Sequence, residues 1–124
     1  MQSITVVVSQ ADQTTAQRLA DRLRAHFHRV VLSGAEELPT TLKNSRASLA
    51  ILDLNAVSLE SVQELSHEFQ DVALVCTHHA PDAEVYLACV QAGAADCCHP
   101  SDIPSIVRAY RSAPAQYRRH AVAA

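Results

Sequence analysis

The sequence predicts a single α/β domain built on a parallel β-sheet with helices on both faces. Short runs of β-branched and small apolar residues, typical of strands buried on both faces, alternate with segments whose apolar residues recur every three or four positions. Strand and helix alternate five times, and this pattern indicates right-handed βαβ crossovers. The 124 residues are enough for one domain with a hydrophobic core and too few for two.

The first three elements follow from local patterns. Residues 4–8 (Ile-Thr-Val-Val-Val) are β-branched throughout and predict a central strand. From residue 13 to 28 the apolar side chains follow the i, i+3, i+4, i+7 spacing of an amphipathic helix, and Asp12 is a suitable N-cap for it. Residues 29–33 predict a second, shorter strand that stops before Gly34.

The middle of the chain carries the residue around which the rest is arranged. Segment 36–44 is expected to form a short or broken helix, because Pro39 fits only a first turn. Residues 49–55 (Leu-Ala-Ile-Leu-Asp-Leu-Asn) predict a buried strand that delivers Asp53 near its end. Ser58 then caps a helix whose apolar positions are Leu59, Val62, Leu65 and Phe69.

The last third continues the alternation. Residues 72–76 predict a fourth strand, and a helix through Ala83, Leu87, Val90 and Ala94 follows, with Gly93 available to end it. Residues 97–98 predict a very short fifth strand. Ser101 or Asp102 caps a final helix, whose apolar positions are Ile103, Ile106, Val107 and Tyr110.

Composition narrows the function. The chain is 48% hydrophobic and 19% charged, has no apolar run of eighteen residues and shows no signal-peptide pattern, so we expect a cytoplasmic protein without membrane contact. All thirteen acidic residues, against six basic ones, lie at or before Asp102, and this argues against a nucleic-acid surface. There is no glycine-rich phosphate loop and no HExxH or GxSxG motif, so we do not expect an enzyme.

Strand-end residues give the chain a resemblance to a known family. These are Asp53 and Asn55 after the third strand, Thr77 after the fourth, and the Ala-Gly-Ala-Ala-Asp run at 92–96 that leads to Pro100. In this order and spacing they resemble the receiver domain of bacterial two-component response regulators. The resemblance implies a flavodoxin-like five-stranded sheet in the order 2-1-3-4-5, a receiver-like domain over residues 1–112, and a tail or linker start over 113–124.

The resemblance also implies phosphoryl transfer to an aspartate, but most of the residues that assist this reaction in the family are replaced here. Asp53 would accept a phosphoryl group from a histidine kinase, but Ser9 and Gln10 stand where the family has two Mg²⁺-binding acids. His99 replaces the lysine before Pro100, and a histidine is mostly neutral at pH 7 whereas a lysine is charged. Only weak Mg²⁺ binding is expected, through Asp53 and the backbone carbonyl of Asn55, and no other cofactor is expected. In the family, a threonine after the fourth strand and an aromatic residue in the fifth strand change conformation on phosphorylation. Here the threonine is kept as Thr77, and Cys97 replaces the aromatic residue.

We therefore predict a degenerate receiver, a pseudo-receiver that acts by binding protein without phosphorylation, and two alternatives stay open. Asp53 either works as a phosphoacceptor in a phosphorelay or merely accepts backbone hydrogen bonds before Ser58. A thiol or metal sensor is the second alternative, using the region around Cys76, Cys97 and Cys98, although alternate strand residues face opposite sides. Without CxxC spacing, the cysteines are otherwise expected to be buried thiols.

The expected contact surface is the one formed in the family by the fourth helix, fifth strand and fifth helix. It carries Tyr86, Arg108 and Arg111, and Tyr110 fits either this surface or the core. A histidine kinase, an output protein or domain, or a second copy of the chain is the expected partner. The basic tail around Arg118 and Arg119 would be a helix end or a linker.

Overall fold

The structure, a computed structural model, describes residues 2–113 and forms one five-stranded parallel sheet in the order β2-β1-β3-β4-β5. The strands are β1 (Gln2–Ser9), β2 (Phe27–Leu32), β3 (Leu49–Asp53), β4 (Ala73–Thr77) and β5 (Asp96–Cys98). The helices are α1 (Gln13–Leu23), α2 (Leu38–Ser45), α3 (Leu59–Glu68), α4 (Ala83–Gln91) and α5 (Ile103–Arg111). The predicted strand order is confirmed. Over the described residues, no helix is long and apolar enough to cross a membrane.

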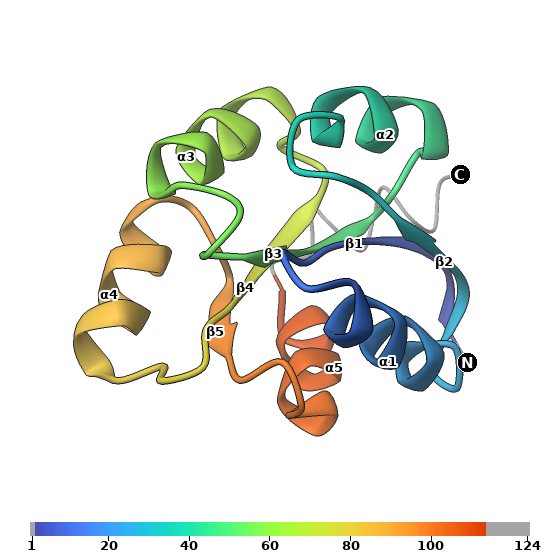
Figure 1. The fold of residues 1–124 in the computed structure, drawn as a ribbon. Coiled ribbons are helices and arrows are strands. Elements are labelled where there is room, and N and C mark those ends of the chain that lie inside the picture. Colours follow the sequence, from blue (N-terminus) through green and yellow to red (C-terminus); the bar gives the residue numbers. More distant parts are fainter. Residues whose placement is uncertain (1, 114–124) are drawn as a thin grey trace.

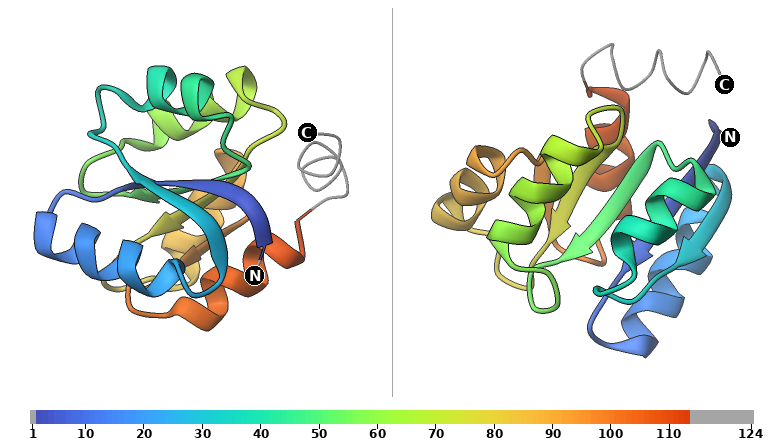
Figure 2. Two further views of the ribbon diagram at one scale, coloured as in Figure 1. Left: turned by 90° about the vertical axis from the view of Figure 1, so that its right-hand side faces the viewer. Right: turned by 90° about the horizontal axis from the view of Figure 1, so that it is seen from above.

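Helices cover the sheet on both faces (Figures 1 and 2). Helices α1 and α5 lie on one face, and α2 and α3 lie on the other. Two hydrophobic clusters fill the layers, and alternate residues of one strand serve different clusters: Val6 and Val8 join the α1–α5 side, and Val7 joins the α2–α3–α4 side. Both β3 and β4 are buried along their whole length, as a strand covered on two faces must be.

The predicted helix caps are confirmed. The side chain of Asp12 accepts a hydrogen bond from the Thr15 N–H, Ser58 accepts from Ser61, and Asp102 accepts from Ser105. Each cap satisfies one of the backbone donors that the first turn leaves without an intrahelical partner. Three of the helices that surround the carboxyl edge of the sheet therefore begin where their sequence specifies.

The boundary between the first helix and the second strand was predicted wrongly. The helix ends at Leu23 rather than near residue 28, and Phe27 opens β2. Phe27 is fully buried, and its ring meets Tyr110 of α5 edge-to-face with centroids 5.8 Å apart. Phe27 also fits the apolar spacing of the preceding helix, so the local pattern does not determine where that helix ends. The contact with Tyr110 of α5 does. That contact also assigns Tyr110 to the core.

Helix α4 also departs from the expected pattern. Its predicted apolar positions Leu87 and Val90 are exposed by 54% and 38%, and Tyr86 by 45%. Cys89 is the buried residue of this helix. Helix α4 therefore contributes little to the core and presents large apolar side chains to solvent.

Gly93 ends the α4 segment in a conformation that other residues rarely adopt. Its φ is +110°, and a Cβ placed there would lie 2.5 Å from the Ser66 Oγ and 2.6 Å from the Ser66 Cβ of α3. We predict that Gly93→Ala lowers the free energy of unfolding by about 1–3 kcal/mol, the cost of holding a residue in a disfavoured backbone region. The clash with Ser66 adds to this loss. Urea unfolding followed by circular dichroism measures this loss.

Gly34→Ala is the matched control, since Gly34 has no positive φ and a Cβ there would meet the flexible end of the Glu37 side chain. This variant should stay within about 0.5–1 kcal/mol of the wild type. Equal losses in the two variants would contradict the role given to the Gly93 backbone and to its contact with Ser66.

Candidate functional site

The residues singled out at strand ends gather at the carboxyl edge of the sheet. Ser9 pairs in register with Leu52, and Asp53 pairs with Thr77 on the neighbouring strand. Ser9, Asp53 and Thr77 are all buried, with exposed fractions of 1%, 6% and 1%. Ligands of open parallel sheets collect at this edge, which makes it the first place to look for function.

Asp53 has both carboxylate oxygens engaged by backbone donors. The Ala11 N–H donates to Oδ2 over 2.8 Å, and the Asn55 N–H donates to Oδ1 over 2.9 Å. The carboxylate thus ties the loop after β1 to the turn after β3. Accepting backbone hydrogen bonds is one of the two roles that the sequence offered for Asp53.

Ser9 and Gln10, in the positions of the acidic pair, differ in what they do. The Ser9 hydroxyl is buried and has no hydrogen-bond partner among the described residues. The Gln10 Nε2 donates to the Thr77 Oγ1 over 3.0 Å and so links the loop after β1 to the end of β4. The sequence did not predict this interaction of Thr77.

His99 is turned toward its own loop. Its Nδ1 accepts the Ser101 N–H over 3.1 Å and lies 2.7 Å from the Ser101 hydroxyl. The His99 ring meets His79 edge-on with centroids 5.5 Å apart, as expected from the pairing of β4 with β5. The Asp53 carboxylate therefore has two neutral backbone donors as its hydrogen-bond partners, and His99 is not one of them.

Solved structures with this architecture come from response regulators. The N-terminal signal receiver domain of a two-component response regulator from Bacteroides fragilis matches with a TM-score of 0.76 at 21% identity, over 88% of this chain and 98% of that one. A response regulator from Thermotoga maritima matches at 0.77 and 21%, over 90% and 99%. The chain has the receiver fold. A CheY-like protein (tadZ) from Pseudomonas aeruginosa PAO1 matches at 0.70 and 20%, over 90% and 96%.

No protein-family model and no curated protein matches this sequence. The TM-scores of 0.76 and 0.77 establish the shared receiver fold, and at 21% identity function has to be argued from the residues at the site.

The residues at this edge fit a Mg²⁺ ion poorly. Mg²⁺ requires near-octahedral oxygen ligands, usually including one or two carboxylates. Asp53 is the carboxylate of the set, and both its oxygens already accept backbone N–H groups. The Asn55 backbone carbonyl is neutral, and no group of three or more His, Cys, Asp or Glu side chains within residues 2–113 is arranged to hold a metal.

The surface residues predicted for partner contact separate into two groups. Tyr86 on α4, together with Arg108 and Arg111 on α5, is exposed. Tyr110 is 3% exposed and belongs to the core. Helices α4 and α5 flank the β5 edge of the receiver sheet (Figure 1). The predicted tail residues Arg118 and Arg119 lie outside the described residues.

The four cysteines are buried free thiols. Cys76, Cys89 and Cys97 belong to the cluster under α2, α3 and α4, whereas Cys98 belongs to the opposite cluster. The expectation that Cys97 and Cys98 face opposite sides is confirmed. Burial raises the pKa of Cys97 to about 12, with the Cys89 thiol adding to it, and burial also raises the pKa of Cys98 to about 12. These raised pKa values keep the Cys97 and Cys98 thiols protonated near neutral pH, which does not support the sensor alternative.

These pKa shifts predict a loss of stability at high pH. Because folding raises the pKa, the unfolded state releases thiol protons first, from about pH 8.5, and stability falls from there up to about pH 12. Each thiol contributes at most about 1.4 kcal/mol for each pH unit in this window. Urea unfolding between pH 7 and 11 measures the slope. Cys98→Ala should reduce it, and an unchanged slope would contradict the assignment.

Proposed function

We propose that this chain is a receiver-like signalling module of a two-component system that acts by binding protein without being phosphorylated. The observation that carries the proposal is the state of Asp53, whose two oxygens both serve backbone N–H groups. The carboxylate that would act as the nucleophile is thus hydrogen-bonded to the backbone of two loops at this edge.

Charge balance supports the same proposal. A phosphoryl group on Asp53 would add about −1.5 to −2 charge by analogy with other phosphorylated residues. Phosphoryl transfer depends on cations that neutralise this charge, and the neutral Ser9 and Gln10 leave Mg²⁺ with few ligands. His99 is hydrogen-bonded within its own loop. We infer that Mg²⁺ binding at Asp53 is weak.

The proposal predicts that the chain is not phosphorylated by a small phosphodonor. Incubation with acetyl phosphate and Mg²⁺ should leave the intact mass of the wild type and of Asp53→Asn unchanged, because the edge lacks the charges that stabilise the transferring group. A receiver that labels under the same conditions serves as the positive control.

A gain of one phosphoryl group in the wild type that is absent from Asp53→Asn would overturn the proposal. It would favour the alternative of a working phosphoacceptor, for which the pairing of Asp53 with Thr77 at the strand ends is the supporting observation.

The surface proposed for partner binding is the exposed face of α4, defined by Tyr86, Leu87 and Val90. Exposed apolar side chains that cluster, rather than occur singly, mark contact sites on soluble domains. Tyr86 offers a large rigid ring with a polar tip, the kind of side chain that anchors interfaces. Arg108 and Arg111 on α5 supply positive charge near the same sheet edge. The partner is a histidine kinase, an output protein or a second copy of the chain.

The proposed α4 surface can be tested by crosslinking. A photoreactive phenylalanine analogue placed at position 86 should give a discrete protein adduct in cells of the source organism, because the α4 face contacts the partner. The matched control places it at position 59, since Leu59 is an equally apolar residue, 40% exposed, on α3. Western blotting of irradiated cells measures the adducts. No adduct at position 86, or the same adducts at both positions, would count against the α4 face.

A further inference from the structure

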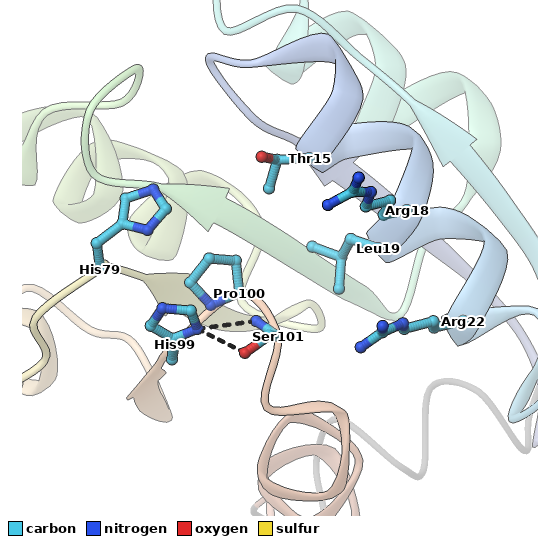
Figure 3. Close-up of a pocket in the computed structure, with 8 residues that line it drawn as sticks. All are labelled: Thr15, Arg18, Leu19, Arg22, His79, His99, Pro100 and Ser101. Carbon is cyan, nitrogen blue, oxygen red and sulfur yellow. Dashed lines mark hydrogen bonds between the residues drawn. The ribbon is translucent and has the colours of Figure 1, made fainter.

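We propose that a pocket between α1 and the loops after β4 and β5 binds a phosphoryl group, carried by a small phosphate monoester or present as free phosphate. Figure 3 shows the pocket, whose volume is about 180 Å³. It lies against α1 and the loop that precedes α5, and Asp53 is not among its lining residues. The inference therefore does not depend on the function proposed for Asp53.

Two arginines give the pocket its charge. Arg18 and Arg22 stand one turn apart on α1, and their side chains leave the helix toward the loop that carries His99 and Ser101 (Figure 3). Within residues 2–113, neither guanidinium forms a hydrogen bond or an ion pair, whereas the guanidinium of Arg24 on the same helix is paired with Asp21. A planar guanidinium presents a fork of donors that matches phosphate oxygens.

No carboxylate lines the pocket. The nearby acids are Asp12 and Asp102, and each is occupied as the N-cap of a helix. Asp12 accepts from the backbone and the hydroxyl of Thr15, and Asp102 accepts in the same way from Ser105. The charge of Asp12 also acts on Arg18 and His79, so the pocket is moderately rather than strongly positive.

His99 adds a hydrogen-bond donor. A backbone N–H can only donate, so the bond from the Ser101 N–H fixes His99 Nδ1 as an acceptor. In the neutral ring the proton is then carried by Nε2, which is left free to donate to an anion. His79 lies against the His99 ring on the far side of the pocket from the arginines (Figure 3).

The size of the pocket and its apolar residues limit the ligand. At about 30 Å³ for each water molecule, the volume corresponds to about six waters, well below the ~300–1,000 Å³ of sites for drug-sized molecules. Leu19 and Pro100 are both buried residues of the lining and offer apolar contact to a few carbon atoms. A phosphoryl group with at most a compact organic part fits this space.

The test is a titration of the ¹⁵N-labelled chain with glycerol phosphate and, separately, with inorganic phosphate, at constant ionic strength. Saturable shifts should appear at the backbone amides of α1 around Arg18 and at those of His99 and Ser101. Arg18→Gln and Arg22→Gln should each weaken binding at least tenfold. Arg29→Gln, which removes an exposed arginine from β2, should bind like the wild type.

The two ligands identify the source of the phosphoryl group. Tighter binding of glycerol phosphate assigns the pocket to a phosphate monoester, and equal binding assigns it to free phosphate. Binding that is not saturable, or that survives both arginine substitutions in variants with wild-type circular dichroism, would overturn the proposal.

Discussion

The carboxyl edge of the sheet depends on one buried carboxylate that is shared by two backbone segments. Asp53 accepts from Ala11 in the loop after β1 and from Asn55 in the turn after β3. Buried polar groups are costly unless they are hydrogen-bonded, and these two bonds satisfy the carboxylate and two backbone donors together. The same side chain that a receiver would use for chemistry thus stabilises the loops around it, and a phosphoryl group on one oxygen would compete with one of these bonds.

The positions of the strands and the helix caps could be predicted because each depends on local sequence, whereas the strand order was implied by the resemblance to receiver domains. The β-branched run of β1, the N-caps Asp12 and Ser58, and Pro39 in the first turn of α2 all act within a few residues. The end of α1 could not be predicted. Phe27 satisfies the helical pattern, and it enters β2 because its ring packs on Tyr110, more than eighty positions away in the chain.

The candidate site also has a part that the sequence predicts and a part that it does not. Strand ends located Asp53, Thr77 and His99, since parallel strands bring their carboxyl ends to one edge. The bond from Gln10 to Thr77 and the turn of His99 toward Ser101 depend on side-chain geometry across elements. Arg18 and Arg22 drew no attention in the sequence because two arginines four residues apart usually mark a solvated helix face. Their spacing was the only signal in the sequence. It indicates a binding site only once the structure places the loop with His99 and Ser101 opposite the two arginines.

Positive charge is therefore distributed differently from what phosphoryl chemistry at Asp53 requires. Neutral backbone donors bind Asp53, while the arginines that could neutralise an anion belong to α1 and face a separate pocket, across from His79 and His99. Helix α4 contributes Cys89 to the core and leaves Tyr86, Leu87 and Val90 exposed, so its outer face is free of the packing constraints that hold α5. The backbone hydrogen bonds of Asp53 hold the sheet edge, and neither the α4 face nor the α1 pocket includes Asp53. Binding at either proposed site would leave these hydrogen bonds intact, as a recognition role for this fold requires.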